Sequence, residues 1–287
     1  MKMLKAFILL ILAACVGLLF YEIRISRYSL TISSYEIASD KLTGQLRIVQ
    51  LTDLHDSEFG EGNSQLVSLV ADQNPDLILI TGDLLDSSVE DTATAEELIA
   101  ALSEFAPVYF SLGNHELEYE ERFGANVTEL FTAAGGILLE RTYLDLEIAG
   151  QRIRLGGLYG YCVPEKYLEE SDARTEESAF LTDMQDTDRY TILLCHMPYA
   201  WLELDGINEW EIDCVFAGHA HGGQIIVPFL GGIWAPDQGW FPGRLWGLFY
   251  SEDGDRCVVL SRGLGSTEVV PRINNVPEVV TVDLTGM

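Results

Sequence analysis

Five short apolar runs, each followed at once by a polar residue of a kind that binds metals, constrain the fold of this chain more than any other feature. Segments with helical spacing at 64–73, 93–105 and 125–134 separate the early runs. Strands that alternate with helices predict βαβ units and a largely parallel sheet. Later apolar runs, broken at Ala149-Gly150 and at Asp253-Gly254, predict hairpins. We therefore expect a mixed α/β domain over 28–287, with main strands at 46–51, 77–81, 108–112, 191–195 and 214–217.

The polar residues that follow these runs predict a single site. In an open α/β sheet, the residues just past the carboxyl ends of neighbouring strands meet in one crevice. Residues from five strand ends should therefore lie together, with His115 beside them. The other expected members are Asp53, His55, Asp83, Asn114, His196, His219 and His221.

The histidines sharpen this prediction, because the chain has five and all of them lie in this set. A single histidine is more often structural. That interpretation does not explain why all five histidines lie at strand ends, together with Asp and Asn. The ligand types suit Mn, Fe or Zn. Seven ligands exceed what one tetrahedral ion takes, so we expect two divalent ions that share a carboxylate. Asp83 is the candidate bridge, because Gly82 permits a sharp turn before it.

The charge of the chain excludes one class of protein. The 45 acidic and 17 basic residues give a formal net charge of -28. Nucleic-acid binding relies on Lys and Arg that displace counterions, so we exclude a nucleic-acid-binding module. The five cysteines include no CxxC motif. Strand-like neighbours of Cys195, Cys214 and Cys257 predict buried thiols rather than a disulfide framework.

An apolar N-terminal segment predicts association with a membrane. The 16 uncharged residues between Lys5 and Glu22 would form about 24 Å of helix, and extension through Ile25 would span the roughly 30 Å hydrocarbon layer. Three interpretations compete: a retained anchor, a cleaved secretory signal, and a lipoprotein signal that ends at Cys15. We favour an anchor over residues 1–27, since no cleavage site followed by polar sequence is present and apolar residues continue past Cys15.

Basic residues flank the segment on both sides, with Lys2 and Lys5 before it and Arg24 and Arg27 after it. The positive-inside bias is therefore nearly balanced. We expect a single-pass protein of the cell membrane whose catalytic domain lies outside the cytoplasm.

The order of the motifs resembles that of the calcineurin-like metallophosphoesterases. Across about residues 46–224 the chain carries D-x-H at 53–55, GD at 82–83, GNHE at 113–116, a single His196 and GHxH at 218–221. More narrowly it resembles the bacterial membrane-anchored branch, with GHAHGGQ at 218–224 and Arg-Gly-Leu-Gly at 262–265. The resemblance implies an α/β fold, a four-layer αββα sandwich, preceded by one N-terminal transmembrane helix.

The resemblance also implies a role for each site residue. His115 would face the scissile phosphate, where it would stabilise developing charge or protonate the leaving oxygen. The expected metal is Mn²⁺, with Fe or Zn as alternatives. One ion would be held by Asp53, His55, Asp83 and His221, and the other by Asp83, Asn114, His196 and His219.

Other residues near the motifs have competing interpretations. Asp86 is either a carboxylate that orients a metal ligand or the cap of a following turn, and the same question applies to Asp56. We expect Glu116 to serve the turn or a salt bridge, and Arg262 to form a surface ion pair rather than to bind phosphate.

Two longer segments are also ambiguous. The aromatic and Gly/Pro-rich segment 231–248 is either a packed loop or a loop near the membrane that accepts a lipid tail. The acidic run 165–177 predicts a solvated surface helix.

These observations predict a dinuclear-metal phosphohydrolase that cleaves phosphodiester or phosphoanhydride bonds with metal-activated hydroxide. The anchored branch resembles UDP-2,3-diacylglucosamine pyrophosphatases and envelope phosphodiesterases, which implies an envelope or lipid-linked substrate. A broad phosphomonoesterase or protein phosphatase is the alternative within the class. A non-catalytic metal-stabilised protein and a cation buffer are alternatives from other classes, and the presence of Asp83 and His115 argues against the first.

Overall fold

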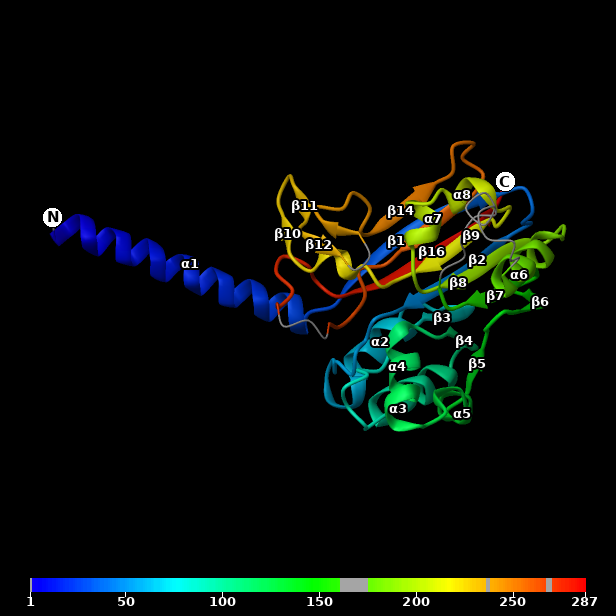
Figure 1. The fold of residues 1–287 in the computed structure, drawn as a ribbon, viewed down its shortest axis with the longest axis horizontal. Coiled ribbons are helices and arrows are strands. Elements are labelled where there is room, and N and C mark those ends of the chain that lie inside the picture. Colours follow the sequence, from blue (N-terminus) through cyan, green and yellow to red (C-terminus); the bar gives the residue numbers. More distant parts are fainter. Residues whose placement is uncertain (1, 161–174, 236–237, 267–269) are drawn as a thin grey trace.

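Two six-stranded sheets form the body of the protein (Figure 1). This computed structural model describes residues 2–160, 175–235, 238–266 and 270–287. The first sheet has the order β1-β16-β2-β3-β4-β5. Strands β2 to β5 run parallel, whereas β16 is antiparallel to β2 and parallel to β1. Its strands are β1 (Thr31–Ser39), β2 (Gln45–Leu51), β3 (Leu77–Thr81), β4 (Val108–Ser111), β5 (Gly136–Leu138) and β16 (Glu278–Gly286).

The second sheet has the order β14-β15-β9-β8-β7-β6. Its four inner strands are parallel, and an antiparallel hairpin partner closes each edge. These hairpins turn at Ala149-Gly150 and at Asp253-Gly254, as the sequence predicts. The strands are β6 (Thr142–Ile148), β7 (Gln151–Leu158), β8 (Tyr190–Cys195), β9 (Cys214–Ala217), β14 (Gly247–Tyr250) and β15 (Cys257–Leu260).

Helices cover the outer face of each sheet. On the first sheet they are α2 (Ser64–Ala71), α3 (Ala93–Ser103), α4 (Asn114–Phe123) and α5 (Val127–Ala133). On the second they are α6 (Glu176–Gln185), α7 (Tyr199–Leu202) and α8 (Gly206–Glu209). The acidic run 165–177 lies mostly outside the described residues, so only the start of α6 belongs to it.

Strand alternation builds three separate cores, because successive side chains point to opposite faces of a sheet. In β2, Ile48 faces the other sheet, while Val49 faces the helices. In β8, Ile192 faces the first sheet, while Leu193 packs under the outer helices. Three cores require four layers, so the predicted αββα sandwich is confirmed.

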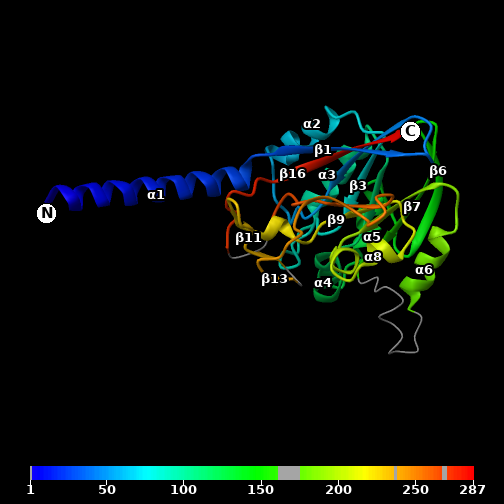
Figure 2. The same cartoon turned by 90° about the horizontal axis from the view of Figure 1, so that it is seen from above.

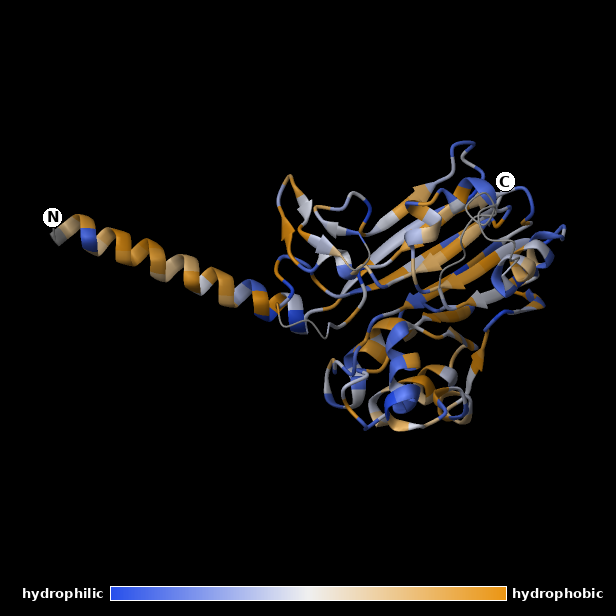
Figure 3. Ribbon diagram, viewed as in Figure 1, coloured by the Kyte–Doolittle hydropathy of each residue, from blue (hydrophilic) through white to orange (hydrophobic). Residues whose placement is uncertain are grey.

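Helix α1 (Lys2–Tyr28) extends away from this body (Figures 1 and 2). By length and composition it is the one helix of the described residues that could cross a membrane, and its apolar window has no buried share. Figure 3 shows apolar residues along most of its length. The helix has 27 residues, about 40 Å, and so exceeds the apolar run from which it was predicted.

Segment 231–248 is not a featureless loop. It contains β11 (Gly231–Gly232), which pairs with β10 (Ile226–Val227), and the hairpin of β12 (Trp234–Ala235) with β13 (Gly239–Trp240). Both views show these hairpins at the end of the body from which α1 emerges.

Candidate dinuclear metal centre

The predicted site residues lie at the carboxyl ends of β2, β3, β4, β8 and β9. Six of the seven expected ligands, together with His115, fall into three overlapping groups whose ligand atoms lie within 4.8 Å of one another. The groups are Asp53, His55 and His221; His55, Asp83 and His115; and Asp83, His196 and His219. Asn114 stands at the start of α4, directly before His115. Strands of both sheets thus contribute residues to one cluster.

The backbone at this cluster is strained. Five of the seven expected ligands have a positive φ: Asp53, His55, Asp83, His219 and His221. A non-glycine residue in this region costs of order 1–3 kcal/mol, and such residues concentrate at functional sites. The sharp turns aim each side chain back over the end of its strand.

Asp83 occupies the centre of the cluster. Its Oδ2 lies 3.1 Å from His196 Nε2 and 3.8 Å from His55 Nε2. Its Oδ1 accepts a hydrogen bond of 2.9 Å from the backbone N–H of His115. The carboxylate therefore touches members of both flanking groups, as a shared ligand would.

The first flanking group presents two imidazole nitrogens to each other. His55 Nε2 lies 3.4 Å from His221 Nε2, and Asp53 Oδ1 lies 3.6 Å from the same atom of His221. Two metal–nitrogen bonds of about 2.0–2.1 Å at a tetrahedral angle span about 3.4 Å. The spacing thus fits two ligands of one ion. Asp53 is fixed by the backbone N–H of His219, which donates to both of its carboxylate oxygens at 3.0 and 3.1 Å.

Hydrogen bonds at the Nδ1 atoms of two histidines fix which ring nitrogen is free to bind a metal. His196 Nδ1 donates to Thr81 O at 2.7 Å, and His55 Nδ1 donates to Leu85 O at 3.3 Å. A proton on Nδ1 leaves the lone pair on Nε2, which is the arrangement found in metal-binding histidines. Asn114 Oδ1 is buried and has no hydrogen-bond partner among the described residues. The donors present fit divalent cations.

The electrostatics of the cluster also favour a cation. Burial lowers the pKa of His55 to about 4 and that of His221 to about 3, so both rings are neutral at pH 7. Burial also lowers the pKa of His196, but the charge and hydrogen bond of Asp83 outweigh it and raise this pKa to about 10. Burial raises the pKa of Asp83, whereas the charges of the surrounding histidines lower it below its usual range. The carboxylate is therefore ionised, and in the absence of a metal the protonated ring of His196 supplies the positive charge beside it.

His115 differs from His55 and His196 in tautomer. Its Nδ1 accepts a hydrogen bond of 3.1 Å from the backbone N–H of Ser87, which places the proton of the neutral ring on Nε2. The ring stands edge-on to His55, with 4.5 Å between the centroids. His115 is half-buried, whereas His55 is buried. The ring is thus a hydrogen-bond donor at the edge of the cluster.

Glu116 holds two of the site loops together. Its carboxylate accepts four backbone N–H bonds of 2.7 to 3.1 Å, from Asp83, Leu84, Leu85 and Gly113. Burial and the charge of Asp83 raise its pKa to about 7, and the backbone donors oppose this. The predicted role in the turn is confirmed.

The other residues that the sequence suggested near the site form hydrogen bonds and ion pairs within the protein. Asp86 accepts hydrogen bonds from the backbone and hydroxyl of Ser88, which is the capping interpretation. Arg262 forms the expected ion pair, with Nη2 at 2.8 Å from Glu278 Oε2, but the pair is not on the surface because Glu278 is fully buried. Asp56 accepts the backbone N–H of Asp86 at 2.8 Å, and burial raises its pKa to about 6.

Two residues at the site escaped sequence reasoning. Arg272 is buried and donates to backbone carbonyls of Arg262, Gly263, Gly265 and Asn275 rather than to a carboxylate. Asn275 is fully buried, and its Nδ2 donates to His221 O at 2.7 Å. Only the charge of Arg272 could have pointed to it in the sequence, because the chain has only 17 basic residues.

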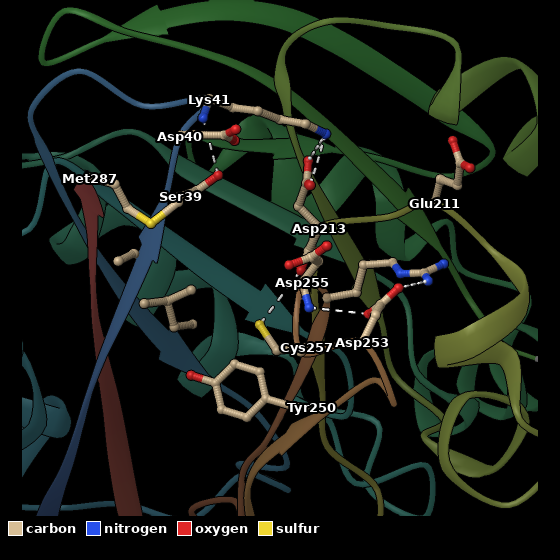
Figure 4. A pocket seen from close by; sticks show the side chains of 14 residues that line it. Ser39, Asp40, Lys41, Glu211, Asp213, Tyr250, Asp253, Asp255, Cys257 and Met287 are labelled. Atoms are coloured by element: carbon tan, nitrogen blue, oxygen red, sulfur yellow. Dashed lines mark hydrogen bonds and ion pairs between the residues drawn. The ribbon is translucent and has the colours of Figure 1, made fainter.

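A cavity lies at the ends of the strands opposite to the candidate metal centre (Figure 4). It has a volume of about 470 Å³ and a mainly acidic rim. Lys41 Nζ lies 2.8 Å from both oxygens of Asp213, which also accepts the backbone N–H of Thr191 at 2.7 Å. These bonds tie the turn that follows β1 to the second sheet.

Comparison with known proteins agrees with the geometry. Residues 46–223 match the family model for the calcineurin-like phosphoesterases, and the chain belongs to this family. It is 30% identical over 254 residues to the phosphodiesterase YaeI of Escherichia coli, covering 83% of this chain and 82% of that protein. It is 27% identical over 246 residues to the uncharacterized metallophosphoesterase YkuE of Bacillus subtilis, covering 83% and 78%. The protein is a metal-dependent phosphoesterase.

The fold has a counterpart among solved structures. The sulfate thiohydrolase SoxB of Thermus thermophilus superposes with a TM-score of 0.50 at 13% identity, over 85% of this chain and 57% of that one. At this identity the likeness concerns the fold alone.

Proposed function

We propose that this protein is a dinuclear phosphodiesterase that hydrolyses a lipid-linked phosphodiester or phosphoanhydride at the membrane. The observation that carries the dinuclear centre is the place of Asp83, whose carboxylate is common to two of the candidate ligand groups. One carboxylate between two sets of imidazoles suits a pair of ions better than a single one.

The ligand roles that the sequence suggests are compatible with these distances. When bound, two divalent ions offset the charge of the phosphoryl oxygens and lower the pKa of a water molecule that becomes the attacking hydroxide. The mixed nitrogen and oxygen donors favour Mn²⁺, with Fe or Zn as alternatives. We assign Asp53, His55, Asp83 and His221 to one ion, and Asp83, Asn114, His196 and His219 to the other.

His115 supplies a hydrogen bond in this proposal. Because Ser87 N–H bonds to Nδ1, the neutral ring presents its Nε2–H group, which donates to a phosphoryl oxygen or to the leaving oxygen and stabilises the charge that develops there. For a diester, water adds to phosphorus, one P–O bond breaks, and the products are an alcohol and a phosphomonoester. The proton that the attacking water releases goes to solvent, and the leaving oxygen takes a proton from solvent.

The position of α1 supports a substrate at the membrane. Ser26 of α1 is fully buried, and its Oγ accepts the backbone N–H of Asn275 at 3.1 Å, while the side chain of Asn275 bonds to His221 O. A cavity of about 280 Å³ has Ile23 and Ser26 on one wall and Gln224 on the other. The helix end thus docks one residue away from a candidate ligand. We assign residues 1–27 as a retained anchor and place domain 28–287 outside the cytoplasm.

The test is hydrolysis of bis(p-nitrophenyl) phosphate and of p-nitrophenyl phosphate by the full chain in mild detergent, with Mn²⁺ and with a chelator. We expect Mn²⁺-dependent cleavage of the diester in preference to the monoester. Faster cleavage of the monoester would favour the phosphatase alternative. Absence of turnover with both substrates, while two ions remain bound, would contradict the proposal and favour a binding protein.

A further inference from the structure

Large apolar side chains are exposed on the face of the domain next to α1. Phe229 is fully exposed, and Leu230, Trp240 and Phe241 each expose 65% or more of their surface. They belong to the hairpins β10–β11 and β12–β13, which both views place at the end of the body beside the helix (Figures 1 and 2). A cluster of this kind on a soluble surface marks an interaction site.

The charge of the same segment departs from that of the protein. Residues 221–250 contain one acidic and one basic residue, in a chain with 45 acidic residues and a net charge of -28. An anionic bilayer would repel the chain as a whole, but not this segment. Trp and Phe side chains are also the residues that favour the boundary between lipid and water. This face is therefore suited to a lipid surface.

An apolar cavity of about 400 Å³ opens beside Trp240, one of these side chains. Its side-chain lining is apolar apart from Gln224, whose Nε2 donates to Ser266 Oγ at 2.9 Å and to Val270 O. The amide of Gln224 is thus turned to partners of its own, and an apolar ligand would not take these hydrogen bonds from it. The remaining walls come from Gly223, Ile225, Ile233, Trp234, Trp240 and Val270.

Residues that line the cavity follow directly in the chain after a candidate metal ligand. Gly223 closes the short 3₁₀ turn that starts at His221, and Gln224 N donates to His221 O at 3.1 Å. Gln224 also lines the smaller cavity against Ile23 and Ser26 of α1. The order along the molecule is therefore candidate ligand, apolar cavity and membrane helix.

We propose that this cavity binds an acyl chain of the bilayer lipid whose phosphoester lies at the metal centre. The inference rests on the proposed function and adds the part of the substrate that is recognised. The link to α1 identifies the occupant, because Gln224 lines both this cavity and the smaller one against Ile23 and Ser26 of the membrane helix. Pockets of this size commonly enclose ligands that are mostly apolar.

The test uses p-nitrophenyl alkyl phosphates, which share one scissile bond and differ in chain length, in the same detergent micelles. The cavity would bind the hydrocarbon of a long ester, whereas an ethyl group is too short to fill it, so kcat/KM for the hexadecyl ester should exceed that for the ethyl ester by roughly tenfold or more. Val270→Trp places bulk at the exposed rim of the cavity. It should remove this advantage of the hexadecyl ester. The matched control is Ile137→Trp on edge strand β5, which should retain the advantage.

A second measurement does not depend on turnover. A hexadecyl phosphate with a diazirine in the chain is photolysed with the full protein, and the labelled residues are mapped by mass spectrometry. Label on Ile225, Ile233 or Trp234 supports the proposal, and label confined to α1 overturns it. Diester hydrolysis without dependence on chain length would refute the acyl site alone. Labelling of the cavity without hydrolysis would refute the proposed function alone.

Discussion

A methyl group added at Gly113 should disturb the metal centre, although the substitution changes none of the proposed ligands themselves. A Cβ at this position would lie 2.6 Å from Asp83 N and 2.8 Å from Asp83 Cγ, and closer still to its Oδ1. Contacts of this kind are not found below 3.0 Å, so the backbone of Asp83 must move by about 0.4 Å and the carboxylate by more. Metal sites tolerate deviations of about 0.2 Å in ligand distance. The variant Gly113→Ala therefore displaces the shared carboxylate.

The size of the effect follows from the cost of such crowding. Extra methyl groups in a packed region cost about 1–3 kcal/mol. If metal binding bears this cost, the midpoint for activation by Mn²⁺ should rise by about 5- to 150-fold. The assay is diester hydrolysis against free Mn²⁺, with metal content by mass spectrometry and thermal unfolding in parallel. Gly243→Ala is the matched control, because its methyl group would meet no atom within 4 Å. A Gly113→Ala midpoint equal to that of the control would refute the reasoning.

Three further variants separate the roles at the site. Asp83→Asn should lower metal content and abolish most diester hydrolysis, whereas Asp72→Asn on the exposed end of α2 should not; near wild-type turnover in Asp83→Asn would sink the bridging assignment. His115→Ala should keep both ions and lose about 10²–10³-fold in kcat, and loss of the ions instead would make His115 structural. Asn275→Ala leaves the His221 carbonyl without its side-chain donor and should lower the free energy of unfolding by about 1–3 kcal/mol, measured by urea titration of the metal-free protein. An unchanged urea midpoint would count against Asn275 as the link between Ser26 and the site.

The parts of the fold that the sequence predicts are those encoded by local patterns. The buried strands β3, β8 and β9 are short, mostly apolar runs, and the glycines and histidines after them are local in the chain. The structure places these side chains together, and their assignment as ligands stays a prediction until a metal is measured. Helix α4 was not expected, because its sequence NHELEYEERF has little apolar periodicity.

Other features depend on long-range packing that no local pattern reveals. Strand β16 inserts between β1 and β2, and this order follows from tertiary contacts. Arg262 was expected on the surface, but its partner Glu278 lies on β16 and is buried. Asn275 bonds to His221, 54 positions earlier in the chain. Buried polar groups of this kind are satisfied by distant backbone atoms, so their role is visible only in the folded structure.

The most direct test of the account is anomalous diffraction from crystals of the protein grown with Mn²⁺. The account predicts two anomalous peaks per chain, with the carboxylate of Asp83 between them and Asn114 Oδ1 bound to the ion on the side of His196. A single peak, or two peaks without Asp83 as a common ligand, would contradict the dinuclear centre.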